Sequence, residues 1–277
     1  MYNRGACNYE LGRYRQAISD FDRAIDTAPA ADAFLGRGKC FHFGDRNYQR
    51  AIDDYDQAVA LAPDDPDVWL FRGLAYDHLD QVARAIADYD QAVALAPDDP
   101  EVWYVRGLAY DQLDQVARAI ADYDQAVALA PDDPEVWYQR GLAHKQADNP
   151  KKAAGDYSQV IDLDPRHAAA FINRGAALWA LDRIDDAAAD FDRAVHLAPT
   201  DPVALYNRAC ALHGIGQDTN NQHLIRQAIA DYEQMLGLIA AGGHDDVPSE
   251  WIELAQSYHN ELLDQLGHNA ADTGAEL

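Results

Sequence analysis

Apolar residues recur along most of the chain with the spacing of amphipathic helices. Between residues 82 and 95 the larger apolar residues stand three or four positions apart, and alanines and three charged residues fill most of the positions between them. The preceding stretch, 66–79, can form a second helix. Pro66 suits the first turn of a helix, whereas Pro97 cannot continue one. The sequence therefore predicts two helices, at about 66–79 and 82–96, joined by a short turn.

This pair of helices recurs with a fixed period. Prolines stand 34 residues apart, at positions 29, 63, 97, 131, 165 and 199. The segments 66–99 and 100–133 are identical at 30 of 34 aligned positions. A period of this length indicates stacked structural repeats, each of which buries its apolar face on its neighbours. We expect seven units, at about 1–31, 32–65, 66–99, 100–133, 134–167, 168–201 and 202–240.

The residues at fixed places in each period resemble the tetratricopeptide repeat (TPR), whose period is also 34. The two nearly identical units match its pattern at Trp69, Gly73, Tyr76, Ala85, Tyr89 and Pro97, and at Trp103, Gly107, Tyr110, Ala119, Tyr123 and Pro131. The resemblance covers residues 1–240 and implies an all-α solenoid, a right-handed superhelix of helix–turn–helix units. The small residues are expected to let the two helices of a unit approach closely, with the aromatic rings filling the space around that contact.

Some units depart from the regular length. Met1 is expected to lie already within the first helix, so either an opening turn is missing or the chain is part of a longer protein. The second unit has a longer turn around residues 44–47. The seventh carries about seven extra residues at 213–222, which we expect to form a surface loop.

The C-terminal region is expected to end the solenoid. Residues 241–267 should form a linker and a capping helix, at about 249–266, and residues 268–277 a disordered tail. The predicted helix has an apolar stripe at Trp251, Leu254, Tyr258, Leu262 and Leu266. Its opposite side is polar, which suits a helix that covers the last repeat and faces water. Whether this helix only caps the stack or lies in the ligand groove stays open.

Arginine and aspartate recur in step with the repeats. The arginines precede the small residue of each first helix, at Arg4, Arg37, Arg72, Arg106, Arg140, Arg174 and Arg208. The aspartates precede the aromatic residue of each second helix, at Asp20, Asp54, Asp88, Asp122, Asp156, Asp190 and Asp231. We predict a ladder of partly buried ion pairs, in which Arg106 pairs with Asp88 or Asp122. The alternative is a row of arginines that faces the phosphates or carboxylates of a ligand.

In TPR proteins, which this chain resembles, the first helix of each unit lines a concave groove that holds the ligand. The resemblance implies groove residues at Leu70, Phe71, Asp77, Tyr104, Val105, Asp111, Tyr138, Gln139, Lys145, Asn173, Trp179, Tyr206 and Asn207. The four positions at which the two nearly identical units differ also fall on this face by the geometry of the family. The alternative for Tyr104 and Tyr138 is that they only pack between neighbouring helices.

Aromatic residues flanked by carboxylates suit a protein or peptide partner with basic and apolar side chains. The set of lysine, arginine and asparagine residues with which chaperone adaptors of this family clamp a C-terminal carboxylate is not present at the matching positions. We therefore do not expect a reader of chaperone tails.

Charge and cysteine content narrow the classes of partner and location. The chain has 22 basic and 47 acidic residues, a net charge of −25, which disfavours nucleic acid and anionic membranes as partners. No apolar run is long enough to span a membrane. The three cysteines are widely spaced, which favours free, buried thiols, a reducing compartment and a cytoplasmic location. The oligomeric state stays open.

No catalytic, metal or cofactor motif is present in the sequence, so we expect no enzyme activity, no metal site and no cofactor. Paired carboxylates such as Asp98 and Asp99 fall on turns, where they suit helix capping better than acid–base catalysis. The main hypothesis is a scaffold that binds a partner in the concave groove, as an assembly factor or adaptor. The alternatives are a peptide sensor that changes conformation on binding, and a substrate-binding arm or fragment of a larger protein.

Overall fold

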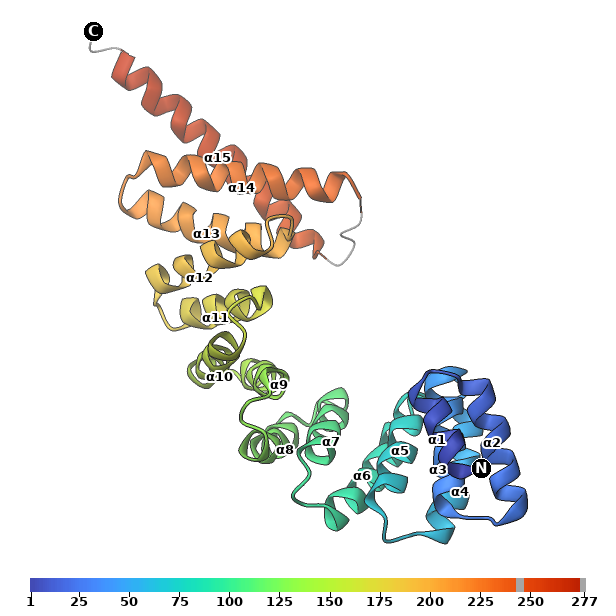
Figure 1. Cartoon of the computed structure of the whole chain (residues 1–277). Coiled ribbons are helices and arrows are strands. Elements are labelled where there is room, and N and C mark those ends of the chain that lie inside the picture. Colours follow the sequence, from blue (N-terminus) through green and yellow to red (C-terminus); the bar gives the residue numbers. More distant parts are fainter. Residues whose placement is uncertain (243–246, 275–277) are drawn as a thin grey trace. The chain divides into compact units, whose positions relative to one another are not determined.

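The computed structural model describes residues 1–242 and 247–274, with side chains described as far as residue 266. All regular elements in this part are helices (Figure 1), as predicted for an all-α solenoid. In chain order they are α1 (Tyr2–Glu10), α2 (Tyr14–Thr27), α3 (Ala31–Lys39), the π-helix η1 (Cys40–Gly44), α4 (Tyr48–Leu61), α5 (Pro66–Asp77), α6 (Val82–Leu95), α7 (Pro100–Gln112), α8 (Val116–Leu129), α9 (Pro134–Gln146), α10 (Pro150–Leu163), α11 (Ala168–Ala180), α12 (Ile184–Leu197), α13 (Pro202–Asp218), α14 (Gln222–Ala240) and α15 (Ser249–Gly274).

Consecutive helices form hairpins, and we call the first helix of each hairpin A and the second B. The A helices are α1, α3, α5, α7, α9, α11 and α13. The chain forms two compact units, Met1–Val136 and Trp137–Leu277, which are described separately. The first helix, α1, begins at Tyr2, so Met1 precedes the helix and does not lie within it.

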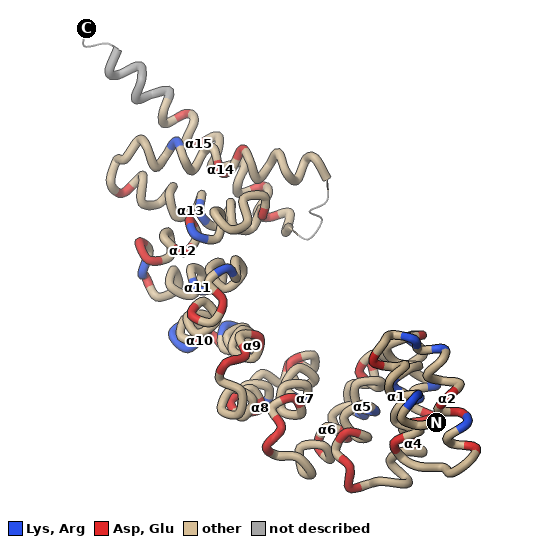
Figure 2. The backbone as a smooth tube through the Cα atoms, viewed as in Figure 1, with Lys and Arg blue, Asp and Glu red and all other residues tan. Residues whose placement is uncertain are grey.

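Helix ends follow the local sequence signals. Before α7, the Asp99 side chain accepts a hydrogen bond from the backbone N–H of Glu101 at 2.9 Å, and Pro100 occupies the first turn. Asp65 and Asp133 cap α5 and α9 in the same way. These carboxylates therefore perform the capping predicted from the sequence. They lie on the turns between hairpins, where Figure 2 shows much of the acidic charge.

Small residues set the distance between the helices of a hairpin. A Cβ atom added to Gly107 on α7 would lie 2.7 Å from Cε1 of Tyr123 on α8, and Gly73 has the same relation to Tyr89 at 2.5 Å. Both tyrosines are almost fully buried. Each glycine therefore provides the space that the ring of the next helix fills, as the sequence predicts.

The arginines and aspartates form the predicted ladder. Arg106 donates from Nε and Nη2 to the two carboxylate oxygens of Asp122, at 2.7 and 2.8 Å, whereas Asp88 pairs with Arg72. The arginine therefore pairs within its own hairpin. The seven pairs of this kind are Arg4–Asp20, Arg37–Asp54, Arg72–Asp88, Arg106–Asp122, Arg140–Asp156, Arg174–Asp190 and Arg208–Asp231.

A second contact links neighbouring hairpins through the same arginines. Nη1 of Arg106 donates to Asp90 of the preceding hairpin at 2.8 Å, and Arg208 reaches Asp192 at 2.9 Å. The repeat pattern of arginine and aspartate did not predict this second partner. Because the guanidinium groups are held by carboxylates of the chain itself, the alternative of a row of arginines facing a ligand is wrong.

The irregular hairpins differ from expectation because helices absorb the extra residues. In the second hairpin, η1 takes up the additional residue. In the seventh, the residues expected to form a loop lengthen α13 and α14 instead, with a short turn at residues 219–221. The seven extra residues amount to about two helical turns, one for each helix, which keeps Arg208 in register with Asp231.

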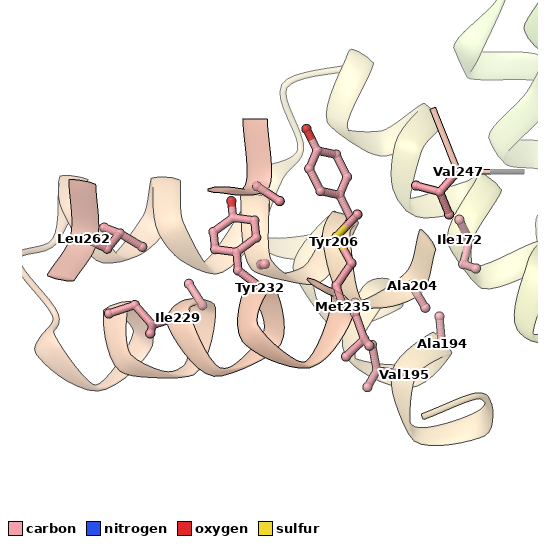
Figure 3. Close-up of a cluster of buried hydrophobic side chains, with 14 of the residues drawn as sticks. Ile172, Ala194, Val195, Ala204, Tyr206, Ile229, Tyr232, Met235, Val247 and Leu262 are labelled. Atoms are coloured by element: carbon pink, nitrogen blue, oxygen red, sulfur yellow. The ribbon is translucent and has the colours of Figure 1, made fainter. Parts of the chain in front are cut away.

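The helix α15 packs on the last hairpin as a cap. Leu262 is fully buried against α14, in a cluster with Ile229, Tyr232 and Met235 (Figure 3). The predicted stripe is wrong at Leu254, which is 41% exposed, because Ala255 occupies the contact in its place. The helix also continues to Gly274, beyond the expected end near residue 266. The predicted tail is thus helical over 268–274, and both 275–277 and the linker residues 243–246 lie outside the described residues.

The three cysteines are free thiols of different exposure. Cys40 is buried and Cys210 half-buried, but Cys7 is exposed, which corrects the expectation that all three are buried. Cys40 packs against Ala17 and Phe21 of α2, in the preceding hairpin, which keeps its thiol from solvent.

Candidate functional site

In each unit, the candidate site is the surface that the A helices of that unit form, which we call the A-helix face. Within the second unit, α11 contacts α13 directly. The cap α15 extends this surface, because the Trp251 ring stacks on Tyr206 of α13 with centroids 4.8 Å apart. The predicted groove residues are placed on α5, α7, α9, α11 and α13, and their accessibility differs between positions.

In the first unit, two predicted groove residues on α5 belong mainly to the core. Leu70 is 3% exposed and lies within a hydrophobic cluster, so its expected role as a ligand contact is corrected to packing. Phe71 is half-buried, and its ring lies 6.4 Å from that of Tyr55 and 3.7 Å from the Nζ atom of Lys39. Lys39 also lies 4.0 Å from Asp67, so this lysine covers one side of the aromatic ring.

The predicted residues on α7 are half-buried. Tyr104 lies with its ring 6.2 Å from Tyr123, and burial together with the nearby carboxylate of Glu135 raises the pKa of Tyr104 to about 12. Val105 packs on the same cluster as Leu70. Tyr104 therefore packs against α8, in line with the alternative that its role is structural.

Two predicted aspartates occupy equivalent positions near the ends of α5 and α7. Asp77 and Asp111 are half-buried, and in each the Oδ1 atom is shielded from solvent without a hydrogen-bond partner among the described residues. Burial, and the nearby Asp114, raise the pKa of Asp111. These carboxylates keep a negative potential at this edge of the face.

In the second unit, the structure joins three predicted groove residues in a hydrogen-bonded chain. Lys145 donates from Nζ to Oδ1 of Asn173 at 3.1 Å, and Asn173 donates from Nδ2 to the Tyr138 hydroxyl at 3.0 Å. The Tyr138 ring also packs 4.8 Å from that of His167. Gln139 follows Tyr138 on α9 and is half-buried. These hydrogen bonds fix the side chains of α9 and α11 relative to each other.

The remaining predicted residues meet in a cleft of about 580 Å³ between α11, α13 and α15. Trp179 of α11 is 39% exposed and forms one wall. Tyr206 and Asn207 of α13 form another, although Tyr206 is largely covered by Trp251. Phe191 and Tyr232, from the B helices α12 and α14, also line the cleft. We call this the α11–α13–α15 cleft.

Polar groups of α13, α14 and α15 complete the cleft. Tyr232 donates from its hydroxyl to the Cys210 sulfur at 3.5 Å. Burial lowers the pKa of His213, so its imidazole stays uncharged near neutral pH. Gln217 donates from Nε2 to Oε1 of Glu261 on α15 at 3.4 Å, which ties the end of α13 to the cap.

Sequence reasoning missed several lining residues of this cleft. Cys210, His213 and Gln217 were not predicted as site residues, nor were Tyr258 and Glu261 of α15. Gly214 and Gln217 belong to the segment that was predicted to form a loop. The signal was the length of the extra segment, close to two helical turns, which suits two longer helices as well as a loop.

Comparison with known proteins agrees with the geometry of the hairpins. One family model, described as tetratricopeptide repeat, matches residues 39–102 and 83–135, and a second with the same description matches residues 8–66 and 138–202. The chain belongs to the tetratricopeptide-repeat family. None of the curated proteins compared with it matches this sequence.

Solved TPR structures share the fold at low sequence identity. The C-terminal part of a TPR protein from Cytophaga hutchinsonii is 17% identical, with a TM-score of 0.74 over 91% of this chain and 98% of that one. YrrB, described as a TPR protein with an unusual peptide-binding site, is 22% identical, with a TM-score of 0.62 over 67% and 96%. MamA is 23% identical, with a TM-score of 0.56 over 58% and 93%. These likenesses show the fold.

Metal sites and membrane spans are features of other protein classes, and the described residues of this TPR chain show neither. Within residues 1–242 and 247–266, no three histidine, cysteine or carboxylate side chains are grouped so that they could hold a metal ion. No described helix combines the length and the apolar character that a membrane span requires.

Proposed function

We propose that this TPR protein is a non-catalytic scaffold that binds a protein or peptide partner along the A-helix face, as an assembly factor or adaptor. TPR hairpins are protein-interaction modules, and this family membership supports the general function. The observation that carries the proposal is the α11–α13–α15 cleft, which exposes the Trp179 ring on the face where a partner would lie. Exposed aromatic residues in concave sites are frequent anchors of protein interfaces.

The chemistry of the partner follows from the charge of the face. The chain carries a net charge of −25, and the first unit contributes half-buried carboxylates at Asp77 and Asp111. We infer a partner segment with basic and apolar side chains, because opposite charge speeds association and aromatic walls favour apolar contacts. The three free thiols are compatible with a reducing location, and we propose a cytoplasmic one.

A peptide-display selection tests this proposal. Random peptides are selected on the wild-type protein and on a variant with Asn173→Ala and Trp179→Ala, whose folding is checked by circular dichroism. The proposal predicts peptides with a shared basic and apolar pattern that only the wild type retains. It is wrong if the wild type selects no peptide, or if the variant retains the same peptides.

A further inference from the structure

The α11–α13–α15 cleft has a chemical character that the general fold does not require. Aromatic rings of Trp179, Tyr206 and Tyr258 line it, and the carboxylate of Glu261 is the single charged group among the lining residues that the structure describes, His213 being neutral. Aromatic faces and a carboxylate both attract cations. No lysine or arginine of the described chain lines this cleft.

Several arginines of this chain are themselves held between an aromatic ring and a carboxylate. The guanidinium carbon of Arg106 lies 4.9 Å from the centre of the Trp103 ring, while its nitrogens bind Asp122. Arg140 is held in the same way, 4.6 Å from the Trp137 ring and bound to Asp156. A tryptophan face combined with a carboxylate is thus the recurrent environment of a guanidinium group in this chain.

We propose that the α11–α13–α15 cleft binds an arginine side chain of the partner, with the guanidinium group against the aromatic walls and paired to Glu261. This inference rests on the proposed function, since it assigns one anchor of the partner to one place on the A-helix face. A planar guanidinium group suits the cleft better than an ammonium group, because it can stack on a ring and pair with a carboxylate at the same time.

The extra residues of the seventh hairpin contribute to this cleft. The lengthened end of α13 brings Gln217 to Glu261, and its amide holds one oxygen of the carboxylate. A Cβ atom added to Gly214, on the same turn, would meet nothing within 4 Å, so the wall is open at this position. The longer helix and the cap together position the carboxylate that would select the basic side chain.

The test uses N-acetyl-arginine amide as the probe and the indole N–H signal of Trp179 in a nitrogen–proton NMR spectrum as the readout. A Trp179→Phe variant assigns that signal. The wild type should show a saturable shift with a Kd on the order of 1 mM, which corresponds to one cation–π contact and one charge-assisted pair. The neutral isostere N-acetyl-citrulline amide should bind about tenfold more weakly.

Two variants of α15 distinguish the effect of the Glu261 carboxylate from the effect of the net negative charge of the protein. Glu261→Gln should weaken binding of the arginine probe about tenfold, to the level of the citrulline probe. Glu253→Gln removes an equal charge from the exposed side of the same helix, away from the cleft, and should leave the affinity unchanged. Both replaced side chains are exposed, so folding of the helix should be preserved.

The proposal is overturned if the arginine probe does not shift the Trp179 signal up to its solubility limit. It is equally overturned if the citrulline probe or N-acetyl-lysine amide binds as tightly, or if Glu261→Gln has no effect. Failure here differs from failure of the proposed function. A scaffold with another anchor would still select peptides by display, whereas a protein that is no scaffold would select none.

Discussion

At the scale of single residues, the fold depends on one buried ion pair and one close contact in most hairpins. The side chain of Arg106 is 14% exposed and that of Asp122 is 6% exposed, whereas Asp90, its partner in the preceding hairpin, is 47% exposed. Removing one member of a buried pair leaves the other charge without compensation, which costs more than loss of an exposed pair.

A double-mutant cycle measures this difference. We expect Arg106→Leu and Asp122→Asn to show a coupling free energy of about 2 kcal/mol in urea unfolding. The same arginine with Asp90→Asn should couple by about 0.5 kcal/mol, because solvent screens that pair. Coupling of Arg106 with Asp88, and none with Asp122, would contradict the pairing described above.

Glycine substitutions test the close contacts between helices. Gly107→Ala should destabilise the protein by about 2 kcal/mol, because the new Cβ atom would lie 2.7 Å from the buried Tyr123 ring. The control is Gly155→Ala on α10, where a Cβ atom meets nothing within 4 Å. That change should stabilise the helix by about 0.5 to 1 kcal/mol. Thermal unfolding of both variants measures these changes in stability. Equal effects would show that a clash with the Tyr123 ring is not the cause.

His42 of η1 should make stability depend on pH. Its side chain is 3% exposed, and burial together with the adjacent His78 lowers its pKa to about 4. Below the unfolded-state pKa of about 6.5, the unfolded chain binds a proton that the folded protein does not, so stability falls as pH falls toward 4.

The comparison with His42→Leu isolates this contribution. Between about pH 7 and about pH 5, the free energy of unfolding of the wild type should fall by about 2 kcal/mol more than that of the variant. Aspartates and glutamates titrate in both proteins, so their effect cancels in the difference. If the wild type and the variant lose equal amounts of unfolding free energy between these pH values, His42 is free to take up a proton in the folded state.

At the scale of helices and turns, each hairpin turns through one residue in the left-handed conformation. The residue two positions before each B helix has a positive φ, at Gly12, Arg46, Asp80, Asp114, Asp148, Asp182 and Asn220. Side chains other than glycine are strained there, and asparagine and aspartate tolerate the strain best. Arg46, with φ at 50°, is the least suited residue of the set.

Exchange at this turn position gives a paired prediction. Arg46→Gly should stabilise the protein by about 0.5 to 1 kcal/mol, and Gly12→Arg should destabilise it by about 1 kcal/mol. A Cβ atom at Gly12 would meet nothing within 4 Å, and Arg46 is exposed, so backbone strain should dominate both changes. Urea unfolding of both variants checks the signs, and changes of the same sign would contradict the backbone explanation.

The helices were predictable from sequence because their period, prolines and capping residues agree with one another. Local patterns also predicted the arginine–aspartate ladder. They could not show which aspartate binds Arg106, since Asp88 and Asp122 occupy the same position in two consecutive B helices. The added residues of the seventh hairpin were predicted to form a loop but lengthen two helices. An insertion of about two turns leaves the helical pattern intact on both sides, so the sequence allows either structure. The cleft depends on how α11, α13 and α15 pack, which no local pattern contains.

At the scale of the whole molecule, stability is distributed over neighbouring hairpins, as in other solenoids. The helix α15 covers the seventh hairpin through buried residues such as Leu262. The cap therefore has two roles in our account, since it also supplies Glu261 and Tyr258 to the cleft.

The central claim is that partners bind on the A-helix face, and one affinity measurement tests it most directly. Trp179 on α11 is 39% exposed, and Leu163 at the end of the B helix α10 is 42% exposed, so the two form a matched pair of exposed apolar side chains. A fluorescently labelled peptide from the display selection is titrated with Trp179→Ala and with Leu163→Ala. We predict that Trp179→Ala raises the Kd about tenfold or more and that Leu163→Ala leaves it within about twofold of the wild type. The opposite result, a loss of affinity with Leu163→Ala and none with Trp179→Ala, would contradict the account and move the binding site to the B helices.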